Sequence, residues 1–343
     1  MNVFVDKHHG ALAESFRLLF EKRLGWTLLF PIGMEWFTQG FWKIGNPYPN
    51  PADTAKQYLG IDDRHWDQYK NLNGDFTIED GIYNVYDPVH EIHQKAITLE
   101  KFKEMPIDIV ISSIPAHDES FARLIREFKP NAKHIAHMGN IYQTTTVKNV
   151  MCSTVPYPTP PDQNVVFYHQ EYSLDVFKYE KPLNTRKIVN FVNLHPAGDI
   201  YNQLKNALPD FEFKSYGAGC PDGTITGIKN IAKIMSESTF GFHVKPGGDG
   251  FGHILWNWAF CGRPIITNFS DYRDKLGGIL LQDGKTALDL EDRDFTANIN
   301  RIVYHSQPDI HKQMCDDMYN LAKQNCDFDK EEQSIRKFLT NLI

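Results

Sequence analysis

The feature that most constrains this chain is an alternation of short buried strand patterns with amphipathic helix patterns, which recurs along its 343 residues. The chain opens with a strand pattern over residues 2–5, a helix pattern over 11–23 and a second strand pattern over 26–30. A strand, a crossover helix and a neighbouring strand form the repeating unit of parallel α/β sheets. The sequence therefore predicts an α/β protein built on parallel sheets.

The same alternation fills the rest of the chain with one interruption. In the first half we expect strands at 107–111, 133–137, 147–153 and 164–167 and a helix over 117–128. In the second half we expect strands at 188–192, 211–216, 240–244 and 264–267 and helices at 199–207, 225–236 and 252–260. Residues 31–93 are rich in aromatic residues, Gly, Pro, Asn and Asp, and we interpret them as inserted short helices and ordered loops. Residues 292–343 read as two or three helices.

Two successive alternations indicate two domains. We expect an N-terminal Rossmann-like domain over residues 1–184, a second over 185–325, and a C-terminal helix over 326–343 that packs back on the first domain. A length of 343 residues fits two domains of ordinary size. We expect the two domains to face one another across a cleft lined by the loops that follow their strands, because ligands bind at the carboxyl ends of such strands.

Composition excludes several classes of protein. The formal charge is −7 and no long run of Lys and Arg occurs, so a nucleic-acid contact would require a local basic patch. The five cysteines are odd in number and form no Cys-x-x-Cys pair, which favours buried thiols in a reducing compartment. The first residues do not have the pattern of a signal peptide, and no apolar run is long enough to span a membrane. We therefore expect a cytoplasmic protein.

The segment from Lys245 to His253 joins a predicted strand to a predicted helix and contains four glycines within six residues. These are Gly247, Gly248, Gly250 and Gly252. Glycines let a ligand approach the backbone, and the start of the following helix presents free N–H groups and a positive dipole end. Lys245 adds a positive charge, and Asp249 can accept hydrogen bonds from sugar hydroxyls. The pattern indicates a phosphate or diphosphate site; a tight strand–helix turn without a ligand is the alternative.

The run DGFGHILWNWAFCGRPII over residues 249–266 carries a more specific resemblance. It resembles the donor-site signature of GT-B glycosyltransferases with group 1 or family 4 donor domains. That signature has Glu-Gly-Phe-Gly, a stretch of helix, Glu-Ala, and then Gly-x-Pro-Val-Ile, and the spacing matches without a gap. Asp249 stands where the family has its first Glu, and Asn257 stands where it has its second. In outline the resemblance covers about residues 186–290.

The resemblance implies roles for the residues of this segment. Asp249 would hold hydroxyls of the donor sugar and contribute to catalysis, and Asn257 would hold the ribose of the nucleotide. The donor-binding residues implied in this way are Lys245, Gly247, Gly248, Gly250, Phe251, Gly252, His253 and Asn257. A basic pair that many members carry after the first strand of this domain is not found here, and we expect Lys245 or His195 to replace it.

Histidines stand at or just after the ends of several predicted strands in the first half. They are His8, His9, His117, His137 and His169. A neutral imidazole can accept a proton from a hydroxyl near neutral pH. Because the carboxyl ends of parallel strands share one edge, we expect these histidines to gather on one rim. His8 or His9, oriented by Asp6, is the favoured catalytic base and His117 a further candidate, whereas purely structural hydrogen bonds are the alternative.

Metal ligands are not expected in this sequence. No Asp-x-Asp stands where a metal-dependent GT-A enzyme would need it. The pairs His90/His93 and Asp62/Asp63 are interpreted as solvated side chains. The resemblance to GT-B enzymes implies that the helix dipole and basic side chains take the place of a metal. We therefore expect no metal and no cofactor, with a nucleotide-diphosphate sugar as a substrate.

The leading hypothesis is a metal-independent glycosyltransferase that moves a hexosyl or pentosyl group from a nucleotide-diphosphate sugar, such as a UDP-sugar, to an acceptor hydroxyl. Residues 4–10 and 18–25 also resemble uncharacterised glycosyltransferase-like proteins of bacteriophage genomes. That resemblance implies a hydroxymethylated base in phage DNA as the acceptor and the host cytoplasm as the compartment. A glycan, a lipid-linked sugar or a small molecule is the alternative acceptor. A non-catalytic nucleotide-sugar-binding module and a sugar-nucleotide epimerase are the alternative functions.

Overall fold

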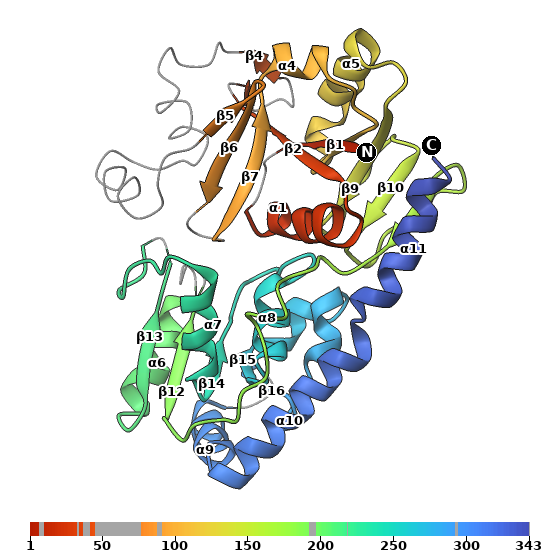
Figure 1. Ribbon diagram of the computed structural model, residues 1–343. Helices are drawn as coiled ribbons and strands as arrows, with labels where there is room; N and C mark the ends of the chain where they lie inside the picture. Colours follow the sequence, from red (N-terminus) through yellow and green to blue (C-terminus); the bar gives the residue numbers. More distant parts are fainter. Residues whose placement is uncertain are drawn as a thin grey trace. The chain divides into compact units, whose positions relative to one another are not determined.

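The computed structural model describes residues 1–6, 10–32, 34–36, 42–44, 77–87, 91–191, 197–217, 219–291 and 294–342. The chain folds into two compact units (Figure 1). Unit 1 comprises Met1–Ser153, Tyr157–Glu171 and Phe328–Ile343, and unit 2 comprises Thr154–Pro156 and Tyr172–Asp327. From the sequence we expected the first domain to end at residue 184. The structure divides the chain earlier, because the ring of Tyr172 packs against Phe260 and the hydroxyl of Tyr179 donates a hydrogen bond to Asp316, both within unit 2.

Unit 1 is built on a nine-stranded sheet in the order β11-β10-β9-β8-β1-β2-β7-β6-β5. The strands from β11 to β7 run parallel, and β6 and β5 extend the sheet as an antiparallel edge. The parallel strands are β1 (Asn2–Val5), β2 (Thr27–Pro31), β7 (Ile92–Ile97), β8 (Ile109–Ser112), β9 (Lys133–Met138), β10 (Asn149–Cys152) and β11 (Asn164–Phe167). All of these except β7 confirm strands that the alternation predicted.

The prediction for residues 31–93 is wrong for the part that the structure describes. Strands stand there instead of short helices and loops: β3 (Met34–Trp36) pairs with β4 (Trp42–Ile44), and β5 (Thr77–Glu79) and β6 (Ile82–Asp87) join β7 in the main sheet. Asp80 and Gly81 connect β5 to β6 with φ values of 50° and 74°. A two-residue hairpin turn needs such positive φ values, and Asp-Gly is a typical sequence for it. That pair was the signal the sequence analysis missed.

Helices cover both faces of the unit 1 sheet. They are α1 (Gly10–Arg17) with its π-helical continuation η1 (Leu18–Arg23), α4 (Leu99–Glu104) and α5 (Asp118–Phe128). Val3 and Val5 of β1 pack in the same cluster as α1 and η1. Phe4, which lies between them in the strand, packs on the other face with Phe102 of α4 and Phe121 of α5. β1 is therefore buried on both sides, as expected for a central parallel strand.

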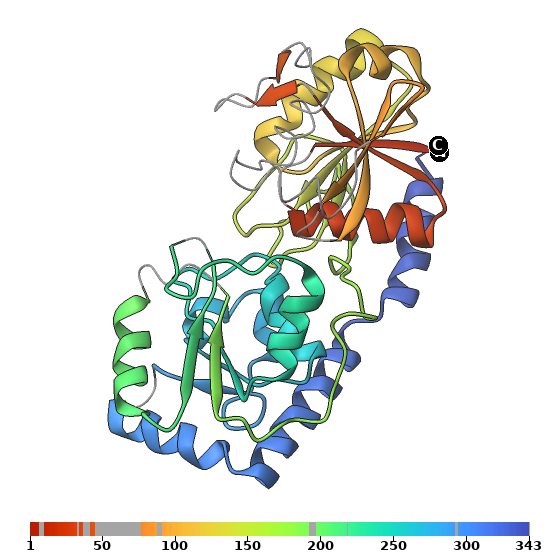
Figure 2. The same ribbon diagram turned by 60° about the vertical axis from the view of Figure 1, so that its left-hand side comes forward.

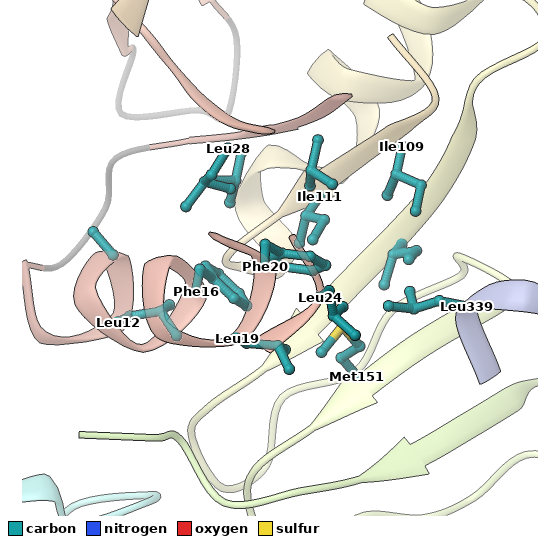
Figure 3. Close-up of a cluster of buried hydrophobic side chains, with 14 of the residues drawn as sticks. Leu12, Phe16, Leu19, Phe20, Leu24, Leu28, Ile109, Ile111, Met151 and Leu339 are labelled. Carbon is teal, nitrogen blue, oxygen red and sulfur yellow. The ribbon is translucent and has the colours of Figure 1, made fainter. Parts of the chain in front are cut away.

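The last helix, α11 (Phe328–Thr340), is part of unit 1. Its residue Leu339 is buried in the same cluster as α1 (Figure 3). An ion pair and a hydrogen bond hold its first turn, where Arg23 Nη1 lies 2.6 Å from Asp329 Oδ1 and His169 Nδ1 lies 2.6 Å from Glu331 Oε1. Residues more than 150 positions apart in sequence are thus joined in one unit.

Unit 2 carries a five-stranded, fully parallel sheet in the order β13-β12-β14-β15-β16. The strands are β12 (Lys187–Asn190), β13 (Glu212–Ser215), β14 (Phe240–Phe242), β15 (Ile265–Thr267) and β16 (Ala287–Asp289), and the helices are α6 (Gly198–Ala207), α7 (Ile228–Ser236), α8 (His253–Phe260), α9 (Phe295–His305) and α10 (Pro308–Asn325). All except β16 confirm predicted elements. Figure 2 shows β12 and β13 between α6 on one side and α7 on the other.

A glycine sets the distance between α8 and the unit 2 sheet. Gly241 is the middle residue of β14, and a Cβ placed on it would lie 2.6 Å from Cε2 of Trp258 in α8. Trp258 is completely buried. The absence of a side chain at residue 241 therefore lets α8 pack directly on the strand that precedes it, which fixes both ends of the loop between them.

Two expectations from composition concern the cysteines and the membrane. The five cysteines form no disulfide and all are buried, as predicted. No helix among the described residues combines the length and the apolar character needed to cross a membrane.

Candidate active site

The glycine-rich segment lies at the carboxyl edge of the unit 2 sheet, between the end of β14 and the start of α8. β13 pairs with one side of β12, and β14, the next strand in sequence, pairs with the other side. The strand order therefore reverses between β12 and β14. In open parallel sheets ligands bind outside the carboxyl ends of the strands at such a reversal. The loop after β14 is thus the candidate ligand site of unit 2.

Left-handed backbone conformations shape this loop. Gly247, Gly248 and Gly252 have φ values of 75°, 56° and 81°. A Cβ on Gly248 would overlap the carbonyl oxygen of Asp271 and Nζ of Lys275, so the backbone approaches its neighbours more closely than any side chain would allow. Among the described residues, no group accepts a hydrogen bond from the amides of Gly250 and Gly252. These donors suit an anionic ligand.

Asp249 is the charged centre of the segment, and 25% of its side chain is exposed. Its Oδ2 lies 3.2 Å from His243 Nε2 and 3.4 Å from the hydroxyl of Tyr272, and its Oδ1 accepts a hydrogen bond from Nζ of Lys245. Burial alone would raise the pKa of Asp249, but the hydrogen bonds and charges of His243 and Lys245 outweigh it and hold the pKa well below its usual range. Asp249 is therefore a carboxylate and can accept hydrogen bonds from hydroxyl groups.

Two buried polar atoms beside the segment lack partners. Nδ1 of His243 and Oδ1 of Asn257 have no hydrogen bond among the described residues. Buried polar atoms are satisfied in the great majority of cases, by protein, water or ligand. Asn257 lies in α8, at the position where the sequence predicted a contact with ribose. Both atoms are therefore candidates for contact with a bound molecule.

Asp271 and Lys275 contact the glycine-rich segment and were not predicted. Oδ1 of Asp271 lies 2.8 Å from the amide nitrogen of Gly247, and Nζ of Lys275 donates to the carbonyl oxygens of Gly247 and Asp271. Asp271 belongs to the short helix η3 (Phe269–Tyr272), which follows β15, the neighbour of β14. Because neighbouring parallel strands end at the same edge, the residues after β15 were the signal that could have suggested this contact.

The other residues predicted to bind the donor are Phe251, His253, Lys245 and His195. The ring of Phe251 is buried and lies 4.8 Å from that of His253 and 6.1 Å from that of Trp256, measured between ring centres. Lys245, expected to compensate the charge of a diphosphate, is paired with Asp249 instead. His195, expected as an alternative cation, lies outside the described residues.

Unit 1 has a polar site at the equivalent place in its own sheet. β1 pairs with β2 on one side and with β8 on the other, so the strand order reverses between β1 and β8. Asp6 follows β1, and its carboxylate accepts hydrogen bonds from the amide of Ser113 at 2.6 Å and from the hydroxyl of Ser113. The same carboxylate lies 2.7 Å from Nδ1 of His117. From the sequence we expected Asp6 to orient His8 or His9, whereas in the structure it pairs with His117.

The hydrogen bonds continue along the edge of the unit 1 sheet. Nδ1 of His137 lies 3.2 Å from the carbonyl oxygen of Ser113, its Nε2 lies 3.1 Å from Oγ of Ser153, and Gln170 donates to that same Oγ. The structure thus brings His117 and His137 into one network. His169 is held by Glu331 of α11 instead, and His8 and His9 lie outside the described residues.

No protein-family model matches this sequence, and no curated protein matches it. Solved structures match over the full length of the chain. The pneumococcal O-GlcNAc transferase GtfA, in complex with UDP and GlcNAc, matches with a TM-score of 0.61 at 10% identity, covering 100% of this chain and 99% of that one. HepE from Anabaena, in complex with UDP and glucose, matches with a TM-score of 0.61 at 11% identity, covering 99% of this chain and 100% of that one. TarM matches with a TM-score of 0.59 at 10% identity, covering 98% of both chains.

Identities of 10–11% carry no information on substrate, but full-length agreement in three dimensions defines the fold. The fold that the residue 249–266 signature implied is confirmed by these matches. Two Rossmann-like units, one with a largely parallel and one with a fully parallel sheet, and C-terminal helices give this chain the GT-B fold.

Proposed function

We propose that this chain is a glycosyltransferase that uses a UDP-sugar as its donor. The observation that carries the proposal is the loop of residues 245–252. Backbone N–H donors, a carboxylate and two lysines meet there, after the end of β14. GtfA and HepE, which have the same fold, bind UDP in the matched structures. This combination of backbone amides, cations and a hydroxyl-binding carboxylate suits a sugar joined to a diphosphate.

The donor would bind to unit 2. The diphosphate would accept hydrogen bonds from the amides of Gly250 and Gly252, and Asp249 would accept hydrogen bonds from the sugar. Asn257 would contact the ribose with its buried side-chain oxygen, which accepts from a ribose hydroxyl. The backbone amides and the lysines of this loop stabilise the negative charge that develops on the leaving diphosphate, and electrostatic stabilisation of this kind is usually the largest contribution to catalysis. No metal is needed in this proposal, because the backbone donors and the cations take its part.

We propose that unit 1 supplies the base that activates the acceptor hydroxyl, and that His117 is this base. Its Nδ1 lies 2.7 Å from the buried carboxylate of Asp6, which accepts the Nδ1 proton. In the neutral imidazole Nε2 is then the basic nitrogen. A carboxylate that orients an imidazole and stabilises its protonated form is a recurring arrangement for general-base catalysis.

The proposal also names the molecule that carries the acceptor hydroxyl. A hydroxymethylated base of phage DNA is the acceptor suggested by residues 4–10 and 18–25, and a net charge of −7 requires that DNA would bind through a local basic surface. Binding to hydroxymethylated duplex DNA, measured between 50 mM and 200 mM salt, would then weaken steeply as salt rises, by roughly 10³-fold for about six phosphate contacts. Binding that is absent, or independent of salt, would exclude DNA in favour of a glycan or a small molecule.

The test of the main proposal is hydrolysis and transfer from a panel of nucleotide sugars, with the product anomers identified by NMR. We expect UDP release from at least one UDP-sugar and binding of UDP by isothermal titration calorimetry. Asp249→Ala should lose turnover. Binding of UDP without any turnover would instead identify a nucleotide-sugar-binding module, and no binding of UDP or GDP at millimolar concentration would contradict the proposal.

A further inference from the structure

Lys275 and Asp271 place two opposite charges against the backbone of the glycine-rich segment, and nothing in the donor-site signature assigns them a role. The amide nitrogen of Gly247 donates to Oδ1 of Asp271 at 2.8 Å. Nζ of Lys275 donates to the carbonyl oxygens of Gly247 and Asp271 and lies 5.5 Å from the centre of the Tyr272 ring. Asp271 therefore binds the N–H group of Gly247, and Lys275 binds its carbonyl group.

Lys245 and Lys275 are different kinds of cation. Lys245 is already paired with the carboxylate of Asp249. In the described part of the chain, Lys275 forms no ion pair with a carboxylate, and its ammonium is held by carbonyl oxygens and by the face of an aromatic ring. Neutral acceptors leave its full positive charge available to an anion. Lys275 is thus the uncompensated cation of this loop.

Asp271 is the anion that contacts the backbone of the loop. Its carboxylate binds a backbone N–H of the glycine-rich segment, which is the type of donor that binds a phosphate oxygen in such turns. A phosphate oxygen and this carboxylate would compete for the same donor, and their negative charges would repel each other. Asp271 therefore opposes binding of an anion that Lys275 favours.

Resting on the proposed function, we propose that Lys275 is the cation that binds the diphosphate of the donor, and that the diphosphate replaces the Asp271 carboxylate at the Gly247 amide. Two residues four positions apart then have opposite effects on donor affinity. Loss of the Lys275 charge weakens binding, whereas loss of the Asp271 charge strengthens it. Lys275 takes the part that the sequence analysis gave to Lys245 or His195.

The experiment is isothermal titration of the full chain and its variants with UDP and, separately, with uridine, which lacks the diphosphate. Lys275→Met should weaken UDP binding by about 10- to 100-fold, the effect of losing one charge-assisted hydrogen bond, and leave uridine binding unchanged. Asp271→Asn, which retains an oxygen acceptor for Gly247, should strengthen UDP binding by about two- to fivefold at low salt. Lys275→Arg should restore most of the affinity that Lys275→Met loses.

The matched control is Lys285→Met, which removes an exposed lysine of the same unit and should leave both affinities unchanged. Wild-type UDP affinity in Lys275→Met, or equal losses for UDP and uridine, would overturn the role of Lys275. Weaker UDP binding by Asp271→Asn would overturn the exchange at Gly247. Failure of the wild-type chain to bind UDP or GDP at all would instead contradict the proposed function itself.

Discussion

Nε2 of His243 lies 3.2 Å from Oδ2 of Asp249, and the imidazole that makes this contact is completely buried at the end of β14. Asp249 is also bound by Lys245, whose side chain is 47% exposed. The buried partner is therefore the one that fixes the carboxylate, since exposed lysines hold a carboxylate only weakly. His243 acts through Asp249 and is a positioning residue for the proposed donor sugar.

We expect His243→Phe to lower the rate of donor hydrolysis by about 10- to 100-fold, because it removes one hydrogen bond to a charged group. The affinity for UDP, which lacks the sugar, should stay close to that of the wild type. His243→Gln retains an N–H donor and should recover part of the lost rate. Steady-state kinetics together with calorimetric titration of UDP measure both quantities, and an equal loss in both would contradict a role confined to the sugar.

Asp6 and His117 form the second pair that we expect to matter. His117→Ala should reduce donor turnover by roughly 10²- to 10⁴-fold, the usual contribution of a general base. Asp6→Asn should cause a smaller loss, because the amide oxygen still accepts from Nδ1 but carries no charge. Since unit 2 is proposed to bind the nucleotide, UDP affinity should not change in either variant. Normal turnover by His117→Ala would exclude this residue as the base and return attention to His8 and His9.

Much of the fold follows from local patterns in the sequence. Buried strands such as β1 and β14 are short apolar runs, each followed by a polar loop and a helix, and their spacing alone predicts a parallel sheet. β6 and β7 lie toward the antiparallel edge of the sheet. Exposed residues alternate with buried ones along most of β7, and in β6 the buried Val85 stands between partly exposed neighbours, so neither strand has that continuous apolar run. The Asp80–Gly81 pair was the only strong local signal for these strands. Such a pair predicts a hairpin only when strand patterns flank it, and the strand patterns on either side are weak.

The candidate site was predictable where it is local and unpredictable where it depends on pairing of strands. The glycine-rich segment is continuous in sequence, so its position after β14 could be read directly. The partners of Asp6 are more than 100 residues away, because they depend on the pairing of β1 with β8. Proximity in sequence favoured His8 and His9 as partners, and proximity in the sheet selected His117. Lys275 was missed for the same reason.

Gly241 gives a prediction about packing. Gly241→Ala would place a methyl group 2.6 Å from the indole of Trp258, which is buried and cannot move without displacing α8. We expect a loss of about 1–3 kcal/mol in the free energy of unfolding, typical of an overpacked core. The control is Gly198→Ala at the start of α6, where an added Cβ meets no atom within 4 Å and should be neutral or slightly stabilising. Urea unfolding of both variants measures the difference, and equal stabilities would contradict the packing argument.

His311 gives a prediction about pH. Its Nε2 lies 2.7 Å from the carbonyl oxygen of Thr239, its ring packs on Phe240, and burial lowers the pKa of His311 to about 4. The unfolded chain takes up this proton near pH 6.5 and the folded chain only near pH 4, so the unfolded state binds more protons between these values. The contribution of His311 to stability is therefore complete above about pH 6.5 and falls, by up to about 1.4 kcal/mol per pH unit, as the pH decreases toward 4.

His311→Gln removes this titration while retaining an N–H donor toward Thr239. We expect the variant to lose less stability than the wild type between pH 6.5 and pH 4.5, even if its stability at pH 7 is lower, because it has no imidazole for the unfolded chain to protonate. Free energies of unfolding in urea at half-unit steps of pH measure the two slopes. Parallel slopes would show that His311 is protonated equally in the folded and unfolded chains, and would contradict its burial as a neutral group in α10.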